Sequence, residues 1–460
     1  MARTRAGRCA AGLERCGYCR CGSRGLRRSN VPNKSKGAGV FRPGDQQAGM
    51  IAMVDPVTNQ ETKGVSLTSD LASPHVVGVI LGNEGYGVRR GWLSLLSGFQ
   101  ARGVPVSALV LQEGEIAALI RARGVEVTAG GLQPPPALQG SGAGKFLLLL
   151  KRAVAQLKAV SVVRREIRRS GANMLLLRSP AEVLLAGLAA RLSGIRAYWL
   201  MPNAISSGYP FDLNRRVYRF VFKHLNVVPI ANSRFTDTTI GPGNFERHVC
   251  HLGISQAEFD PTVPGTIRRA ELGIPEDAMV LGVFARMVAD KGQRRLAEAL
   301  SDLGEEAARV HLLLCGGPLD SAYATELNTF VQGHGLAGRV HFTGPISDVA
   351  SYYKICDVVV NSRLDPEPFG FSVIEGMMLG KPVLAHKAGG PGETVVDGLT
   401  GWHIEGPDRQ AFVVALRRVL ADLPRLAEIG QAARAHALAN FTSYKMVGRI
   451  VDIVAGGRKA

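Results

Sequence analysis

The chain has 460 residues, of which 46% are hydrophobic and 20% are charged. This length suits two α/β domains better than a single core, and the composition excludes an intrinsically disordered protein. The longest aliphatic runs, such as 146–150, fall far short of the roughly 20 residues needed to span a bilayer. About half of the formal net charge of +17 lies in residues 1–49, where eleven cations face two acids. The rest of the chain is only mildly basic, which disfavours a nucleic-acid-binding protein.

Residues 1–70 are rich in Gly, Arg and Ser and are predicted to form a disordered basic leader. Cys16, Cys19 and Cys21 have spacing that is compatible with zinc, but no second Cys/His pair follows at finger-like spacing, so a metal site is disfavoured. No secretory signal is recognisable, and Met50 is an alternative start of the protein. The scattered, unpaired cysteines of the remaining chain fit a reducing cytoplasm.

Ordered structure is predicted to begin with a buried strand over His75–Gly82, followed by a glycine turn at Gly85 and Gly87. A helix is expected near 89–102 and a second strand over 104–111. This β-turn-α-β beginning indicates a parallel sheet. Further strands are predicted at 174–177, 197–201 and 227–231.

A second α/β series is predicted after a break near residues 255–268. Its expected strands are 279–284, 310–314, 340–342, 358–361 and 382–385. The chain is therefore predicted to form two Rossmann-like domains with parallel sheets. Ligands of such sheets bind outside the carboxyl ends of the strands, so the cleft between the domains is the expected site.

The segment from Glu367 to Glu375 carries the clearest chemical signal, because a glycine-containing loop at Gly370 runs directly into a helix. The start of a helix offers free backbone N–H groups and a positive dipole end, and nearby carboxylates accept hydrogen bonds from hydroxyls. Phosphates and polyols are the matching ligands. Taken alone, the two glutamates are also compatible with a purely structural role, as helix-capping and surface-charge residues.

The order of the motifs resembles the retaining glycosyltransferases of family 4, bacterial group 1 type, whose fold is GT-B. Their E-x7-E signature is similar to Glu367 and Glu375 here. The other matching segments are Phe284–Gly292, Cys315–Pro318, Val340–Gly344, Gly380–Ala385, Gly389–Glu393 and Asp397–Gly401. The resemblance covers roughly residues 75–455 and is strongest over 279–402.

The resemblance implies a nucleotide-sugar donor, UDP- or GDP-linked, and no other cofactor. It implies that Arg286 and Lys291 stabilise the leaving diphosphate, that Glu367 holds the ring hydroxyls of the sugar, and that these three residues are the catalytic ones. Glu375 is expected to hold the donor ribose. The remaining donor-binding positions are Gly370, Phe371, Ser372 and Val373, the base-side Gly316 and Gly344, and the phosphate-side Gly85 and Gly87.

Two absent motifs disfavour other enzyme classes. The sequence contains no Asp-x-Asp, which disfavours a metal-dependent GT-A enzyme, and no metal site is expected. It also lacks G-x-G-x-x-G after the first strand, which disfavours a dehydrogenase. Where many relatives carry a histidine after the strand at 197–201, this chain has Asn203 or a neighbour, so its acceptor side is expected to differ.

A basic helix is predicted within Lys145–Arg169, which holds eight cations and one acid. Its expected apolar stripe, which would pack on the domain, is Phe146, Leu150, Ala153, Leu157 and Val160. The opposite side, with Lys151, Lys158, Arg165 and Arg169, is either a solvated surface or a site for an anionic membrane. A nucleic-acid site is disfavoured because no aromatic side chains are interleaved.

The predicted domains are the leader (1–70), an acceptor domain (71–262), a donor domain (263–440) and a C-terminal helix (441–460) that crosses back to the acceptor domain. The expected function is metal-independent, retaining transfer of a hexosyl unit to a glycan or lipid-linked acceptor, in the synthesis of surface polysaccharide or glycolipid. The expected location is the cytoplasm, at the inner face of its membrane. The alternatives are a GT-B enzyme acting on a small soluble acceptor and a non-catalytic scaffold that binds nucleotide sugar or membrane.

Overall fold

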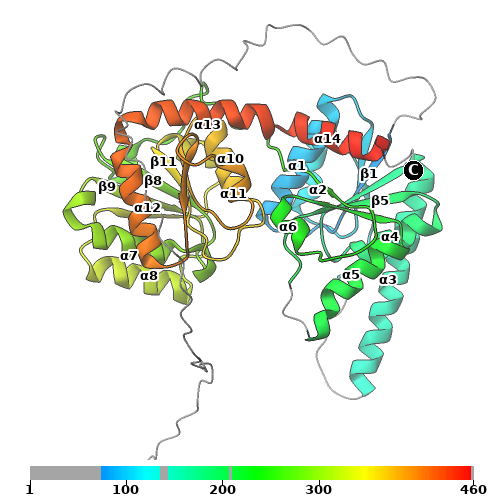
Figure 1. Ribbon diagram of the computed structural model, residues 1–460. Helices are drawn as coiled ribbons and strands as arrows, with labels where there is room; N and C mark the ends of the chain where they lie inside the picture. Colours follow the sequence, from blue (N-terminus) through cyan, green and yellow to red (C-terminus); the bar gives the residue numbers. More distant parts are fainter. Residues whose placement is uncertain (1–73, 135–142, 207–209, 457–460) are drawn as a thin grey trace, which may run out of the picture. The chain divides into compact units, whose positions relative to one another are not determined.

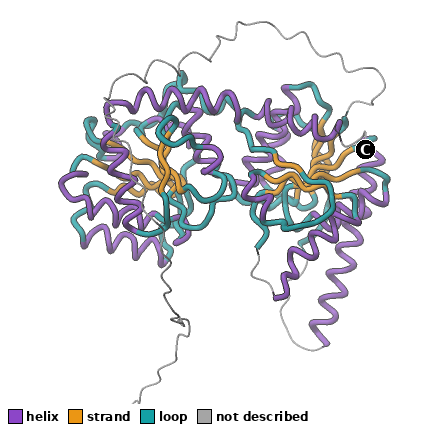
Figure 2. Tube along the Cα trace, viewed as in Figure 1, coloured by secondary structure: helices purple, strands orange, loops and turns teal. Residues whose placement is uncertain are grey.

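The computed structural model describes residues 74–134, 143–206 and 210–456 (Figure 1). The predicted leader, with Cys16, Cys19 and Cys21, lies outside the described residues. The described chain forms two parallel sheets, and helices cover both faces of each (Figure 2). The predicted fold class, two Rossmann-like parallel-sheet domains, is confirmed.

The first sheet has the strand order β3-β2-β1-β4-β5-β6-β7, and its neighbouring strands are parallel. Its strands are β1 (Val76–Ile80), β2 (Val106–Val110), β3 (Glu126–Ala129), β4 (Met174–Leu177), β5 (Arg196–Met201), β6 (Val227–Ala231) and β7 (His248–Val249). Its helices are α1 (Tyr86–Ala101), α2 (Glu115–Arg121), α3 (Ala143–Ser170), α4 (Val183–Leu192), α5 (Leu213–His224) and α6 (Arg234–Thr238).

The second sheet has the order β10-β9-β8-β11-β12-β13 and is also parallel. Its strands are β8 (Met279–Phe284), β9 (Val310–Cys315), β10 (Val340–Gly344), β11 (Val358–Asn361), β12 (Val383–His386) and β13 (Gly401–Ile404). The helices that follow β7 are α7 (Gln293–Leu303), α8 (Ala322–Gly333), α9 (Val349–Lys354), α10 (Phe371–Met378), α11 (Pro391–Thr394), α12 (Arg409–Ala421), α13 (Leu426–Asn440) and α14 (Ser443–Gly456).

Burial on both faces explains why the central strands read as unbroken apolar runs. In β1, Val76 and Ile80 belong to one buried cluster, whereas Val77 and Val79 belong to another on the opposite face. Such strands have no polar face to alternate with, which is typical of parallel sheets. The strands that were not predicted, β3, β7 and β13, are short, and β3 is exposed at both ends.

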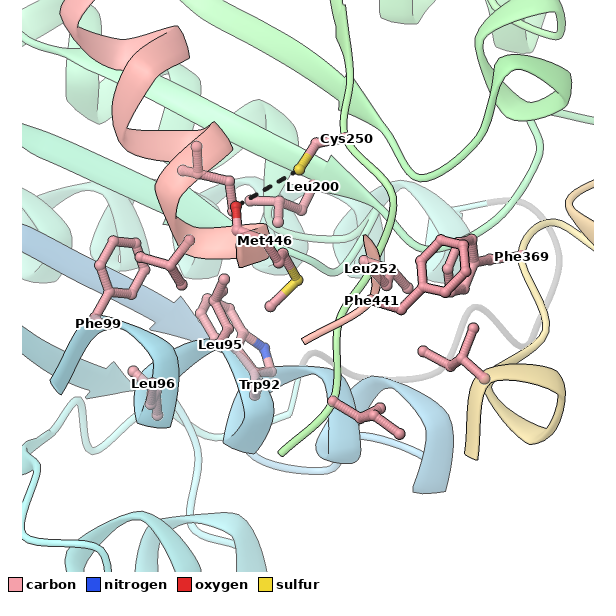
Figure 3. Close-up of a cluster of buried hydrophobic side chains, with 14 of the residues drawn as sticks. Trp92, Leu95, Leu96, Phe99, Leu200, Cys250, Leu252, Phe369, Phe441 and Met446 are labelled. Atoms are coloured by element: carbon pink, nitrogen blue, oxygen red, sulfur yellow. Dashed lines mark hydrogen bonds between the residues drawn. The ribbon is translucent and has the colours of Figure 1, made fainter. Parts of the chain in front are cut away.

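The C-terminal helix α14 packs against α1 of the first sheet. Figure 3 shows Met446 of α14 in the same buried cluster as Trp92, Leu95 and Phe99 of α1. A Cβ atom at Gly98 of α1 would lie 2.6 Å from the Ser443 carbonyl oxygen, so the two helices approach closely. The polypeptide therefore leaves the second sheet through α13, and α14 packs on the first.

Helix α3 confirms one part of the predicted apolar stripe and contradicts another. Val160 is buried as expected, but Leu157 is 63% exposed, and the buried face continues through Val163 and Ile167. Arg169, expected among the free cations, forms ion pairs with Glu126 and Glu166 at 2.8 Å. The side chains of Phe146, Leu150 and Ala153 lie outside the described residues. The buried face follows the sheet, and only the C-terminal half of α3 lies against it.

No helix within residues 74–134, 143–206 and 210–456 combines the length and apolar character needed to cross a membrane.

Candidate active site

A cavity of about 770 Å³ lies at the carboxyl ends of the strands of both sheets. Most of the residues predicted from the sequence line it: Gly85, Gly87, Arg286, Lys291, Gly316, Glu367, Gly370, Phe371, Ser372 and Glu375. Two others do not. Val373 belongs to α10 but is fully buried in the core. The Gly344 carbonyl accepts a hydrogen bond from the Gly316 N–H at 2.9 Å.

Lys291 reaches the cavity from a tight turn that follows β8. The turn depends on Gly292, which has a φ of 71° and approaches the Ser362 carbonyl so closely that a Cβ would lie 1.9 Å from its oxygen. The Ser362 hydroxyl donates a hydrogen bond to the Lys291 carbonyl at 2.7 Å. The loop after β8 is thus held against the end of β11. Arg286 lies in the same loop with an exposed side chain, and the described residues provide no ion-pair partner for it.

Glu367 is held by contacts of both its side chain and its backbone. Its Oε2 atom lies 3.3 Å from Lys291 Nζ and 3.4 Å from Arg363 Nη1. Its carbonyl accepts a hydrogen bond from the Gly390 N–H at 2.8 Å. A Cβ at Gly389 would lie 2.2 Å from that carbonyl oxygen, and the φ of Gly389 is 92°. The glycine pair of the motif therefore positions the glutamate.

Helix α10 begins immediately after Gly370, which has a φ of 91° and provides no side chain to cap the helix. The first turn of α10 contains no acidic residue, and its backbone N–H groups and positive dipole end lie at the cavity wall, beside Glu367. Ser372 accepts a hydrogen bond from the Asn361 amide at 3.3 Å, which ties the first turn to the end of β11.

Glu375 is buried, with only 4% of its surface exposed. Its carboxylate lies 2.9 Å from Arg90 Nε of α1 and accepts a hydrogen bond from the Tyr353 hydroxyl at 2.8 Å. Burial raises the pKa of Glu375, and the attraction of Arg90 and the bond from Tyr353 oppose that rise. The second glutamate of the signature is therefore coupled to the first sheet.

The loop before α1 faces the cavity from the other sheet. Gly85 is the N-cap residue of α1, no side chain caps the helix there, and the first turn holds no acid. A Cβ at Gly85 or Gly87 would meet no atom within 4 Å. Packing within the protein does not require these glycines to be small, so they leave open space for a ligand.

Several residues of the site were not predicted from the sequence, although they line the cavity or hold it together. Arg90 and Arg178 line it, and Glu393 joins the two sheets. Arg178 had a usable signal, because it directly follows the buried strand β4. Glu393 ends the Gly389–Glu393 motif, but its partners are distant in sequence, so the motif gave no indication of its role. Arg90 had no signal, because its partner Glu375 is also distant in sequence.

Glu393, from the Gly389–Glu393 motif, binds the start of α6 in the first sheet. Its carboxylate accepts hydrogen bonds from the backbone N–H groups of Arg234 and Phe235, both at 2.9 Å, and lies 3.0 Å from His251 Nε2. Burial acts to raise the pKa of Glu393, but the hydrogen bonds from His251 and the two backbone groups outweigh it and lower the pKa. The ionised form is therefore the stabilising one.

The geometry defines the class of protein: a two-domain α/β protein of GT-B type, with a cavity lined by cations and by two helix N-termini. Comparison with solved structures agrees. The crystal structure of Anabaena Alr3699/HepE in complex with UDP and glucose aligns with 83% of this chain and 100% of its own, with a TM-score of 0.69 and 21% identity. WaaG, a glycosyltransferase involved in lipopolysaccharide biosynthesis, aligns over 83% of this chain and 100% of its own, with a TM-score of 0.59 and 16% identity. These likenesses show the fold.

Comparison of sequences tests the resemblance predicted from the motifs. Residues 266–436 match the model for glycosyl transferases group 1. The GDP-mannose-dependent alpha-(1-6)-phosphatidylinositol monomannoside mannosyltransferase of Mycolicibacterium smegmatis is 29% identical over 61% of this chain and 75% of its own. The D-inositol 3-phosphate glycosyltransferase of Corynebacterium diphtheriae is 34% identical over 40% of this chain and 45% of its own. The matched part thus spans about half the length of that second relative. The resemblance to group 1 glycosyl transferases that the motifs predicted is therefore confirmed over residues 266–436.

The carboxylate of Glu393 generates a prediction about stability and pH. Because its pKa is lowered on folding, its contribution is complete above the usual glutamate value of 4.5 and is lost as the pH falls through the folded-state value. Glu393→Gln should lower the free energy of unfolding by about 1–2 kcal/mol at pH 7, the range for losing a charged group at a helix start. The difference from wild type should shrink as the pH falls to about 4.

Chemical denaturation at a series of pH values measures this difference. The exposed Glu305→Gln variant serves as the control, with little effect at any pH. A Glu393→Gln deficit that is equal at pH 4 and pH 7 would contradict the assigned role of the ionised carboxylate.

Proposed function

We propose that this chain is a retaining, metal-independent glycosyltransferase that transfers a hexosyl unit from a nucleoside diphosphate sugar to a glycan or lipid-linked acceptor. The observation that carries the proposal is the grouping of Arg286, Lys291, Glu367 and Glu375 on one wall of the cavity, beside the start of α10. The relative that is named for GDP-mannose and the neighbouring structure that holds UDP and glucose support a nucleotide-sugar donor.

The cations act on the leaving group. When the glycosidic bond of the donor breaks, the diphosphate gains negative charge, and preorganised cations stabilise that charge most in the transition state. Arg286 offers a planar fork and Lys291 a compact charge. Both lie on the loop after β8, and the start of α10 adds the positive end of a helix dipole. In this proposal they perform the role that a metal ion has in other transferases.

In this proposal the two glutamates bind different parts of the donor. Glu367, beside Lys291, accepts hydrogen bonds from the sugar hydroxyls and stabilises the positive charge that develops on the ring. Glu375 accepts hydrogen bonds from the hydroxyls of the ribose. Retention of configuration follows in this proposal if the acceptor attacks from the face of the leaving group, with a phosphate oxygen as base. Glu367 then positions the sugar and forms no covalent bond to it.

The first prediction of this proposal concerns the diphosphate. Arg286→Met and Lys291→Met should each weaken binding of UDP or GDP and slow turnover, at a cost on the order of 2–4 kcal/mol in the transition state. Lys387→Met is the matched control, because Lys387 is an exposed lysine of the same domain that pairs with Glu405 outside the cavity. Calorimetry with the nucleotide and initial rates measure the two effects.

The same assay tests independence from metal. Turnover should persist after treatment with EDTA, since the two cations supply the stabilisation. Loss of turnover in EDTA that Mg²⁺ or Mn²⁺ restores would contradict the metal-independent mechanism.

The second prediction separates the two glutamates. Glu375→Gln should mainly raise the KM for the donor, because ribose contacts exist before and during reaction, whereas Glu367→Gln should mainly lower kcat. The ion pair between Glu375 and Arg90 suggests a different role for Glu375, which is to hold the two sheets together. The variant Arg90→Met tests this role. If it raises the KM for the donor as much as Glu375→Gln does, the effect on KM comes from loss of the ion pair and not from loss of a ribose contact. Wild-type kinetics in both glutamate variants would refute the proposed roles.

The proposal includes action at a membrane, in the synthesis of surface polysaccharide or glycolipid, with the protein in the cytoplasm. The free buried Cys250, Cys315 and Cys356 fit a reducing compartment. The supporting surface lies on α3 and α5, which both contact α4. Its exposed apolar side chains are Val154, Leu157, Phe211, Leu213, Val217 and Phe220. Its exposed cations are Lys151, Lys158, Arg165, Arg216 and Lys223.

This combination suits an anionic bilayer, because cations attract the headgroups while apolar side chains enter the interface. Phe211 is 90% exposed, which is costly for an aromatic ring in water. Each cation near the membrane surface contributes about 1 kcal/mol, and salt screens that contribution. We call this region the α3–α5 surface.

The third prediction is that the chain binds anionic liposomes at low salt, loses most binding by about 0.5 M salt and binds neutral liposomes weakly. Reversal of Lys151, Lys158 and Arg165 to Glu should abolish flotation without affecting donor hydrolysis, because none of the three lines the active-site cavity. The chain used should start at Met50, so that the cations of residues 1–49 do not contribute.

The control for this prediction reverses three exposed cations of the second sheet's domain, Arg268, Arg309 and Lys387, and should float like the parent. Equal flotation of the α3–α5 variant and the parent would assign these residues to an ordinary solvated surface.

A further inference from the structure

Gln293, the first residue of α7, has a fully buried polar side chain two residues after Lys291. Its Nε2 atom donates a hydrogen bond to the Arg286 carbonyl at 2.8 Å, and its Oε1 atom accepts one from the Tyr323 hydroxyl at 3.1 Å. Burial of an amide is costly unless its nitrogen and its oxygen are both paired, and here both are. Gln293 is therefore held in one place, although it does not itself line the cavity.

Tyr323, in the first turn of α8, fixes which way the Gln293 amide points. The start of α7 has no side-chain cap, and the Tyr323 hydroxyl instead accepts a hydrogen bond from the Arg294 N–H at 3.0 Å. The proton of that hydroxyl is then available for donation, so Oε1 of Gln293 faces Tyr323. The Arg286 carbonyl can only accept, so Nε2 of Gln293 faces it.

The Arg286 carbonyl and the Met287 N–H belong to one peptide unit, and hydrogen bonds hold this unit at both sides. The carbonyl accepts bonds from Gln293 and from the Val288 N–H at 3.0 Å, and the Met287 N–H donates to the Gly317 carbonyl at 2.9 Å. The side chain of Met287 is buried and anchors the same place. Because a peptide unit is planar, these bonds fix its orientation and limit the directions in which Arg286 can present its side chain.

Arg286 depends on its backbone for this orientation. Its side chain is exposed, and the described residues provide no ion-pair partner that would hold it. Lys291 differs, because its Nζ atom lies 3.3 Å from Glu367 Oε2. A guanidinium binds phosphate oxygens through a planar set of N–H groups, so a small change in its direction weakens the contact.

We propose that Gln293, held in turn by Tyr323, is a positioning residue that orients Arg286 toward the leaving diphosphate. This inference rests on the proposed function, because it takes Arg286 as a cation that acts on that diphosphate. Gln293 touches neither substrate and acts through the backbone of the loop after β8. Loss of its amide should therefore affect the reaction only through Arg286.

A double-mutant cycle tests this dependence on Arg286. Gln293→Leu retains a side chain of similar volume but cannot donate to the Arg286 carbonyl, so kcat should fall about tenfold. In the Arg286→Met background the same substitution should lower kcat by less than about twofold, since the guanidinium is already absent. Gln332→Leu, at an exposed position of α8, is the matched control and should behave like its parent in both backgrounds. An equal loss from Gln293→Leu in both backgrounds would overturn the proposal, by giving Gln293 a general structural role.

Hydrogen exchange of the Met287 N–H tests the orientation of the peptide unit without relying on activity. Gln293→Leu should speed this exchange about tenfold, because the carbonyl of the same unit loses its buried donor, whereas Gln332→Leu should leave it unchanged. Unchanged exchange in Gln293→Leu would overturn the proposed positioning. If Arg286→Met itself binds UDP or GDP and turns over like wild type, the role of Arg286 in the proposed function is refuted, and hydrogen exchange still decides whether Gln293 holds the unit.

A second variant, Tyr323→Phe, keeps the test decisive if Gln293→Leu does not fold. It removes only the hydroxyl from a half-buried ring, so Gln293 keeps its donor but loses the partner that fixes its amide. The expected fall in kcat is smaller, about threefold, and should again disappear in the Arg286→Met background. Wild-type turnover of Tyr323→Phe, or a loss that persists in that background, would overturn the proposal.

Discussion

The cavity wall that carries Arg286, Lys291, Glu367 and Glu375 depends on one close backbone contact, between Gly389 and Glu367. No residue with a Cβ fits there, because that atom would meet the Glu367 carbonyl oxygen at 2.2 Å. The contact fixes the loop that leads through Gly370 into α10, and α10 in turn places Glu375. A similar close contact, between Gly292 and the Ser362 carbonyl, fixes the turn that carries Lys291. The charged groups of this wall are therefore positioned by backbone packing, and their own ion pairs are secondary.

The residues that form the cavity also connect the two sheets. Arg90 of α1 reaches Glu375 of α10, and Ser233 donates a hydrogen bond to the Pro368 carbonyl at 2.6 Å. Glu393 binds the start of α6. The first two contacts involve Glu375 itself and Pro368, the residue after Glu367, so a ligand that competes for Glu375 also acts on the link between the sheets.

The cavity carries uncompensated positive charge on both sides. Arg286 belongs to the second sheet and Arg178 to the first, and neither has an ion-pair partner among the described residues. The N-termini of α1 and α10 add two positive dipole ends without acids in their first turns. A protein maintains such charge at a cost in stability, which bound anionic groups would offset.

The sequence by itself determined the parallel sheets and most of the residues that line the cavity from the second sheet. Buried strands such as Met174–Leu177 are continuous apolar runs, and Glu367 and Glu375 belong to one local loop and helix, so their proximity follows from spacing alone. Only the tertiary structure decided the partners Arg90 and Glu393, the buried state of Arg178 and the exposure of Leu157. Periodicity shows which residues of α3 share a face, but the extent of the sheet beneath it decides which of them are covered. Pairings between segments far apart in the chain have no local pattern, because they arise only when distant elements pack together.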